Sequence, residues 1–390
     1  MKRNKAISKC HSERIFFDIS TSCAIIQKRF LRNDSKSVLA FFFLLFAFSA
    51  PAGAQTNFAR VEKTWEWKFP RDHGRHLEYQ TEWWYFTGNL KAEEGRRFGY
   101  ELTFFRQALA PEILPRPSPW AFRDAYVAHF AVTDVENGKF YYAQKTARGA
   151  LNLAHADSAA LAVHLGDWIA RPKGDAIHLR AASAFGAIDL SLTPQKPPVF
   201  HGDHGLMPNS SLPGDAAYYY SFTSLQTAGR LTIAGDSLRV SGVSWMDHEF
   251  FTSHSGSDVT GWDWFSLHLS DSTEVMLFRF QRSDGSSSPY SAGTFIQRNG
   301  ADCRLTAHDF DLIPQAWWTS PASGGKYPIA WKIKFLDYEL QLRTPLKNQE
   351  LDVRRTTRNF YWEGYVEVAG KKGEREMRGE GYLEMTGYTK

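Results

Sequence analysis

A chain of 390 residues with 46 Lys or Arg, 42 Asp or Glu and 15% aromatic residues is long enough for two domains of ordinary size. Nine of the basic residues and three of the acidic ones lie in the first 54 positions, so the rest of the chain is nearly neutral and gives no electrostatic reason to expect nucleic-acid binding. Only Cys303 follows position 54, which excludes a disulfide within the remainder of the chain.

The first predicted element is a secretory leader. A basic segment at 28–36 precedes the apolar run from Ser37 to Ala50, and the small residues Ala52, Gly53 and Ala54 follow it in an A-x-A cleavage pattern. The apolar run is too short for a membrane span. We therefore predict a signal peptide within residues 1–54 that is cleaved near Ala54, a secreted or periplasmic protein, and no integral membrane span in the mature chain.

Beyond the leader, short runs of aromatic and β-branched residues recur between turn-forming residues, at spacings typical of antiparallel strands and hairpins. The expected strands and hairpins cover residues 82–90, 97–106, 125–134, 229–242, 261–271, 273–285, 327–335 and 359–370. Short helical pieces are expected only around 111–124 and 346–353. The fold class that follows is all-β, with enough strands in each half to close an antiparallel barrel or curved sheet.

A segment rich in Pro, Gly and polar residues, 193–215, interrupts the strand rhythm and is typical of a long loop or crossover. We place a domain border near residue 225. The prediction is an N-terminal domain over 55–225 and a C-terminal domain over 226–390.

The stretch SWMDHEFF, residues 244–251, places three titratable side chains inside an apolar run. In a strand, Asp247 and Glu249 share a face with Trp245, while His248 points to the opposite face. Desolvation and mutual repulsion would raise the pKa of at least one of the two carboxyls, which could then donate a proton near neutral pH.

A structural explanation of the same stretch stays open. Buried Arg106 or Arg279 could neutralise Asp247 and Glu249, so that the acids only tie the two halves together.

Three further strands set acids beside aromatic rings. Residues 82–86 place Trp83 and Tyr85 on one face and Trp84 on the other, GWDWF at 261–265 contains two indoles and one acid, and YWEG at 361–364 contains a fourth such pair. The recurrence is typical of a cavity for a large apolar ligand with a few polar groups, although ordinary packing of Trp-rich strands produces it too. The residues that we predict to contact a ligand are Trp83, Trp84, Tyr85, Arg106, His129, Trp245, Trp262, Asp263, Arg279 and Trp362.

Motifs for other chemistry do not occur in the sequence: it has no G-x-S-x-G elbow, phosphate loop or dinucleotide fingerprint. His201 and His204 in HGDHG could join Asp247 or His248 around zinc, but their spacing matches no established ligand motif. We predict no metal and no cofactor.

Several long motifs resemble one known family in order and almost from end to end, from about residue 65 to residue 390. They are HLEYQTEWWYFTGNL, GYELTFFR, YVAHFAVTD, WMDHEF, GWDWFSLHL, YPIAWKI, YWEGYVEVAG and GEGYLEMTGY. The resemblance is to the AttH-like proteins, which are described as predicted secreted hydrolases and are related to carotenoid 1,2-hydratases and, more distantly, to lipocalin-like fungal cyclases. It implies two consecutive lipocalin-like β-barrel domains with a ligand space in or between them.

The hydratase branch also implies a reaction. There a carboxylic acid protonates a double bond, aromatic faces hold the carbocation and water adds. Carried over to this sequence, Asp247 would be the donor and His248 would handle the water, with Trp84, Trp245 or Trp262 beside the cation. The hydratases have an HNW-type run after the first Asp, whereas Glu249 and Phe250 stand here.

Two functions follow from these observations. The protein is either a cofactor-free hydro-lyase or hydrolase that acts on an isoprenoid, polyketide or lipid-like molecule through Asp247, His248 and Glu249, or a periplasmic carrier of a hydrophobic small molecule without catalysis. The sequence alone leaves both open.

Overall fold

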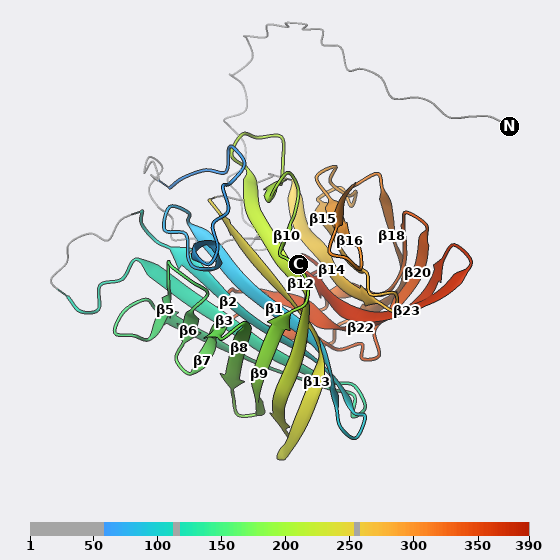
Figure 1. Cartoon of the computed structure of the whole chain (residues 1–390), viewed down its shortest axis with the longest axis horizontal. Helices are drawn as coiled ribbons and strands as arrows, with labels where there is room; N and C mark the ends of the chain where they lie inside the picture. Colours follow the sequence, from blue (N-terminus) through green and yellow to red (C-terminus); the bar gives the residue numbers. More distant parts are fainter. Residues whose placement is uncertain (1–57, 112–117, 253–257, 390) are drawn as a thin grey trace, which may run out of the picture. The chain divides into compact units, whose positions relative to one another are not determined.

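The computed structural model describes residues 58–111, 118–252 and 258–389. The predicted leader and its cleavage site near Ala54 lie outside the described residues. Within the described ranges the secondary structure is two antiparallel β-sheets and one 3-10 turn, η1 (Arg71–His73) (Figure 1). No helix in these ranges has the length and apolar character needed to cross a membrane.

The first sheet contains thirteen strands of the described chain, paired in the order β4-β3-β2-β1-β13-β12-β9-β8-β7-β6-β5, with β10 and β11 paired to β12. Their bounds are β1 (Thr81–Ala92), β2 (Arg97–Ala108), β3 (Asp124–Asp134), β4 (Lys139–Arg148), β5 (Ala154–Ala156), β6 (Val163–Leu165), β7 (Trp168–Lys173), β8 (Ala176–Ala182), β9 (Gly186–Pro194), β10 (Val199–Phe200), β11 (Leu206–Pro208), β12 (Ala216–Ile233) and β13 (Asp236–Phe251). The sheet curls around an apolar core that includes Phe86, Phe130 and Trp168.

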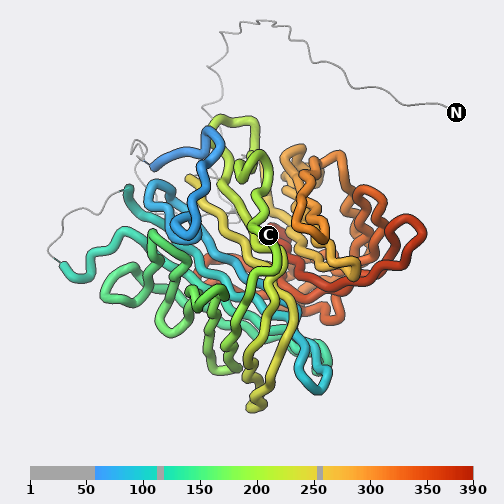
Figure 2. The backbone as a smooth tube through the Cα atoms, viewed as in Figure 1, coloured from blue at the N-terminus to red at the C-terminus, as the bar shows by residue number. Residues whose placement is uncertain are grey.

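The second sheet contains ten strands of the described chain, in the order β17-β16-β15-β14-β23-β22-β20-β19-β18, with β21 paired to β22. Their bounds are β14 (Val259–Leu269), β15 (Glu274–Arg282), β16 (Ala292–Ile296), β17 (Asp302–Thr306), β18 (Phe310–Thr319), β19 (Lys326–Phe335), β20 (Tyr338–Arg343), β21 (Glu350–Asp352), β22 (Phe360–Lys372) and β23 (Arg375–Met385). Its own core includes Phe265, Trp331 and Trp362. Figure 2 shows that the chain completes the first sheet before it enters the second.

Neighbouring residues of one strand pack into two different apolar regions. Phe86 and Met246 pack inside the first sheet, whereas Tyr85 and Trp245 pack against Trp264 of the second sheet. Because successive side chains of a strand point to opposite faces, one strand can fill the core of its own sheet and also contact the other sheet. We call the region between the two sheets the interface.

Close backbone approach and polar contacts hold the interface together. Asn89 Nδ2 donates a hydrogen bond to the carbonyl of Gly381 at 3.0 Å. Gly99 of β2 lies so near β22 that a Cβ atom on it would be 2.9 Å from the Cβ of Tyr365, which explains a glycine in the middle of a strand. The two sheets therefore pack at a distance that larger side chains would prevent here.

The all-β prediction with two consecutive antiparallel barrels is confirmed, since each sheet curls into a barrel or half-barrel and every predicted strand is present. The segment 193–215 connects strands as expected, with the short β10 and β11 added to β12.

The helix predicted at 346–353 is wrong. Leu351 and Val353 alternate into the interface and the segment pairs with β22 as β21, so tertiary contact overrides any helical tendency. The helix predicted at 111–124 falls partly outside the described residues; of its described part, residues 118–123 are irregular and Asp124 begins β3.

The change of sheet falls between β13 and β14, whereas residue 225, where we predicted a domain border, lies inside β12. The exposed turn residues of 193–215 made that segment look like a linker, but β12 and β13 continue the first sheet beyond it. The division into two separate domains stays a prediction.

Candidate functional site

Five carboxyl side chains from both sheets meet at the interface, and we call them the acid cluster: Glu101 on β2, Asp247 and Glu249 on β13, Glu363 on β22 and Glu384 on β23. Glu363 stands directly opposite Glu384 in the strand pairing. Burial, followed by the charges of Asp247 and Glu384, raises the pKa of Glu249 well above its usual range. Burial and the charges of Glu384 and Glu101 do the same for Glu363. The charges of these groups therefore influence one another's pKa.

Strand alternation explains why these acids stand among aromatic rings. Tyr85 of β1 is the cross-strand partner of Asp247, and Trp264 of β14 is the partner of Glu384. Side chains of such partners lie on the same face of the sheet. Asp247 and Glu384 thus each stand beside an aromatic ring that shields them from solvent.

Asp247 is buried and accepts three hydrogen bonds. Tyr219 Oη donates to its Oδ2 at 2.7 Å, Trp245 Nε1 donates to Oδ1 at 2.5 Å, and Ser221 Oγ donates to Oδ1 as well. Burial raises the pKa of Asp247 to about 7, and the three donors keep it from rising further. Near neutral pH this carboxyl can both give and take a proton.

A chain of hydrogen bonds connects Asp247 to His201 and onward to the second sheet. His201 Nε2 lies 2.7 Å from Ser221 Oγ, and His201 Nδ1 lies 2.8 Å from Thr294 Oγ1 of β16. Burial lowers the pKa of His201 to about 3, so its ring is neutral. Ser221 has one hydroxyl hydrogen and donates it to Asp247, so His201 must donate from Nε2 to Ser221 Oγ. The hydrogen bonds therefore run from His201 through Ser221 to Asp247. His204 is exposed and takes no part in it.

Glu101 and Glu363 each have one satisfied and one unsatisfied carboxyl oxygen. Thr103 Oγ1 donates to Glu101 Oε1 at 2.5 Å, and Tyr85 Oη donates to Glu363 Oε1. Both side chains are fully buried, and the Oε2 atoms of both have no hydrogen-bond partner. Burial raises the pKa of Glu101 to about 8.

The acid cluster has one partly exposed side. Glu249 and Glu384 are half-buried, as are the rings of Trp83, Phe105 and Trp262 around them. Burial and the charge of Glu101 raise the pKa of Glu384 to about 8, although a hydrogen bond from Trp262 opposes the shift. Indole and phenyl rings therefore lie on this side together with the two acidic residues.

Arg106 does not neutralise this cluster, which answers one question that the sequence left open. Its guanidinium lies inside the first sheet, where Nε donates to Glu82 Oε2 and Nη1 donates to Asp124 Oδ1, both at 2.9 Å. Two further bonds reach the backbone carbonyls of His76 and Tyr79. Arg106 is therefore part of a buried ion network of the first sheet.

Arg279 is also engaged elsewhere. It lies within the second sheet, 2.6 Å from Asp263 Oδ2 and stacked over the Trp331 ring. Tyr388 Oη donates to the same aspartate at 2.6 Å. The predicted ligand residues Asp263 and Arg279 thus form a structural pair, and Trp362 packs in the same core with its indole nitrogen bonded to the Lys347 carbonyl.

His248 points away from Asp247, into the first sheet. Its Nε2 lies 2.9 Å from Glu82 Oε1 and its ring stacks on Trp84. The geometry therefore separates His248 from the two acids beside it in the sequence, and a role for it in handling water at Asp247 finds no support. Trp84, predicted as a ligand residue, belongs to this interior as well.

The donor atoms of His76, Glu82 and His248 lie within 4.8 Å of one another, a set that could hold a metal ion. Both imidazoles already bond to Glu82 Oε1, and the cation of Arg106 occupies Oε2. Burial is outweighed by Arg106 and by the two imidazoles, so the pKa of Glu82 is held below its usual range. The group is a satisfied ion network that stabilises the first sheet.

His129 bridges the sheets beside the acid cluster. Its Nδ1 lies 2.8 Å from Tyr361 Oη and its Nε2 lies 3.1 Å from Thr356 Oγ1. Burial lowers its pKa to about 3, so it is neutral and positions Tyr361.

Of the predicted site residues, the structure brings seven to the interface and leaves six in the sheet interiors. The interface residues are Trp83, Tyr85, His129, Trp245, Asp247, Glu249 and Trp262. The interior residues are Trp84, Arg106, His248, Asp263, Arg279 and Trp362.

Sequence reasoning missed Glu101, Glu384, Tyr219 and Ser221. A signal existed for the two glutamates, since each falls in a strand on the face opposite to that strand's apolar core residues. No local signal marks Tyr219 or Ser221, because only the pairing of β12 with β13 brings them to Asp247.

Comparisons with known proteins give one family. The family model for AttH-like proteins matches residues 60–388. Comparison with curated proteins gives no match.

Among solved structures, a protein assigned as an AttH from Nitrosomonas europaea is 30% identical, with a TM-score of 0.77, over 85% of this chain and 100% of that one. Kievitone hydratase from Nectria haematococca is 14% identical, with a TM-score of 0.63, over 85% and 98% of the two chains. CghA bound to Sch210972 is 12% identical, with a TM-score of 0.50, over 80% and 89%. The last two share the fold, which is lipocalin-like.

Proposed function

This chain belongs to the AttH-like family, and from that premise we propose that it binds a hydrophobic small molecule at the partly exposed side of the acid cluster, with Asp247 as its proton donor and acceptor. One observation carries the proposal. Asp247 and its neighbouring acids lie among aromatic rings with no basic partner in the described part of the chain, so burial holds their protons near neutral pH. A purely structural network would pair these charges.

The chemistry that suits this arrangement is the addition or removal of water at a double bond. The proton of Asp247 adds to one alkene carbon while the π bond breaks, and the positive charge forms on the other carbon. Water attacks that carbon and loses a proton, which returns to the Asp247 carboxylate, so the enzyme is regenerated. The reverse sequence removes water.

Aromatic faces at the site would stabilise the intermediate cation. Trp262 and Trp83 are half-buried beside Glu249 and Glu384, and cation–π contacts contribute roughly 0.5 to 2 kcal/mol each. A shared fold with kievitone hydratase is compatible with this chemistry, while the residues of this chain are its support.

A carrier without catalysis is the second candidate, and one observation favours it. Three donors hold the Asp247 side chain in one position, and both of its oxygens are already hydrogen-bonded. A carboxyl held in this way can orient a bound ligand without reacting with it.

We also propose that the protein acts outside the cytoplasm. The support is the leader pattern before Ala54, which only the sequence supplies.

The test uses farnesol in water labelled with heavy oxygen, with wild-type protein, Asp247→Asn and the control Asp236→Asn, an exposed aspartate at the other end of β13. An enzyme incorporates label in the wild type and the control, and loses at least about 100-fold of that rate in Asp247→Asn while binding is kept. A carrier binds farnesol equally in all three proteins and incorporates no label. Absence of farnesol binding by the folded wild type would refute the proposed site for this class of molecule.

A further inference from the structure

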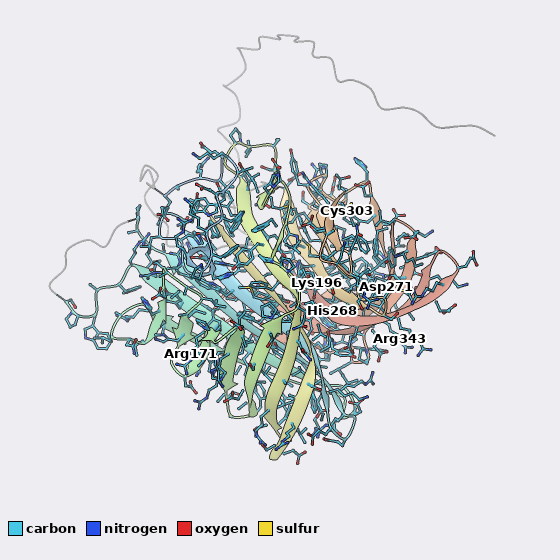
Figure 3. The ribbon with its side chains drawn as sticks, in the orientation of Figure 1. Arg171, Lys196, His268, Asp271, Cys303 and Arg343 are labelled. Atoms are coloured by element: carbon cyan, nitrogen blue, oxygen red, sulfur yellow. The ribbon has the colours of Figure 1, made fainter. Side chains whose placement is uncertain are left out.

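Among the described residues, the charges at the acid cluster are all of one sign. None of its five carboxyls forms an ion pair with a described Lys, Arg or His. Lys196, which is labelled in Figure 3, lies between β9 and β10 and pairs instead with Glu274 of the second sheet at 2.6 Å. A ligand anion at the cluster would therefore meet carboxyls and no counter-charge from the described chain.

The other titratable groups at the cluster do not change this balance. They are Tyr85, Tyr219, Tyr361, Tyr382 and His129, and burial raises the pKa of the four tyrosines well above the usual range and lowers that of His129 to about 3, so all five are neutral. Only the carboxyls acquire charge between neutral and mildly alkaline pH.

The fully buried acids also lack an acceptor for their protons. Glu101 and Glu363 use Oε1 to accept hydrogen bonds and leave Oε2 without a partner. A protonated Oε2 is a donor, and at these two buried positions it finds no acceptor in the described chain, so the cluster has more donors than acceptors when it is protonated.

We propose that the acid cluster selects its ligand by charge: it accepts uncharged apolar molecules that carry a carbonyl or hydroxyl oxygen, and it excludes carboxylates such as fatty acids. The inference rests on the proposed function, because it assumes that the ligand binds at this cluster. Ionised carboxyls without a counter-charge repel a ligand carboxylate, whereas a neutral oxygen can accept a hydrogen bond from a carboxyl that is still protonated.

The experiment compares three probes with the same hydrocarbon chain: farnesol, farnesoic acid and farnesylamine. Their affinities for the protein are measured by isothermal titration calorimetry at pH 8.5 and at pH 6. At pH 8.5 farnesol is expected to bind at least about tenfold more tightly than farnesoic acid, a difference of about 1.4 kcal/mol. The ratio should shrink at pH 6, where the cluster is protonated.

Two variants separate the effect of the cluster from the ordinary preference of any apolar site. Glu384→Gln removes a carboxyl from the partly exposed side and should reduce the alcohol-to-acid ratio at pH 8.5 by about threefold or more, whereas the control Glu374→Gln, in an exposed turn, should leave it unchanged. Glu249→Gln provides the same test if Glu384→Gln does not fold.

Farnesoic acid bound as tightly as farnesol, an unchanged ratio in both cluster variants, or farnesylamine bound more weakly than farnesoic acid at pH 8.5 would each overturn charge selection, because carboxylates attract an ammonium group and repel a carboxylate. Failure of all three probes to bind would instead refute the proposed function from which the inference starts.

Discussion

Replacement of Asp247 by Asn should make the protein more stable at alkaline pH and slightly less stable at acid pH. The side chain is 4% exposed, and its pKa of about 7 in the folded protein compares with 3.8 for an ordinary aspartate. The folded protein favours the protonated form of Asp247, so the side chain stabilises the fold most when the pH lies below its pKa in the unfolded chain. This stabilisation is lost as the pH rises from about 4 to about 7. The loss amounts to about 4 kcal/mol, because one pKa unit corresponds to about 1.4 kcal/mol.

The hydrogen bonds determine what the Asn side chain keeps. Trp245 and Ser221 both donate to Oδ1, which an amide oxygen can replace, but Tyr219 donates to Oδ2, which would become an NH₂ group. One lost hydrogen bond costs about 1 kcal/mol. We therefore expect Asp247→Asn to be about 1 kcal/mol less stable than the wild type at pH 4 and about 3 kcal/mol more stable at pH 9.

Urea denaturation at the two pH values measures this difference without the charge screening that guanidinium chloride causes. Equal destabilisation of the variant at pH 4 and pH 9 would refute the reasoning, since it would mean that the aspartate is an ordinary ionised group in the folded protein.

Three further predictions concern other parts of the two sheets. Arg106→Met should destabilise the protein by roughly 3 to 5 kcal/mol in urea denaturation, because buried Glu82 and Asp124 each lose an ion pair, although Asp124 keeps a second one, with Arg75, and should leave farnesol affinity unchanged in the fraction that folds. Gly99→Ala should cost about 1 to 3 kcal/mol, because the new Cβ meets the Cβ of Tyr365; a neutral effect on the melting temperature would show that the sheets can separate at no cost. Trp262→Phe should raise the pKa of Glu384 above about 8, because the phenyl ring cannot donate to it, and a pH titration followed by carboxyl infrared absorption would show no change if that hydrogen bond were unimportant.

The sequence predicted the fold class well because the physical cause is local. Apolar residues alternate with a period of two within each strand, and this pattern predicts strands from local sequence. The same alternation predicted Asp247 and Glu249 on one face and His248 on the other, as found. The predicted border near 225 and the helix at 346–353 depended on pairing with distant strands, which no local pattern contains.

The candidate site was predicted in part for the same reason. Asp247 and Trp262 were identified from residues adjacent in the sequence, whereas the cluster also needs Glu101 from β2 and Glu384 from β23. Arg106 looked like a partner for Asp247 because a buried guanidinium must neutralise some carboxylate, but the register of β1 with β2 gives it Glu82 instead.

Native mass spectrometry of the wild-type protein, purified without added ligand from the cells that produce it, tests most directly whether an apolar molecule occupies the site between the sheets. We predict that an uncharged organic molecule accompanies the wild type and is absent from a folded variant in which Trp83 and Trp262 are both changed to Ala. A wild-type protein that carries no small molecule, or a double variant that retains the same one, would contradict the account.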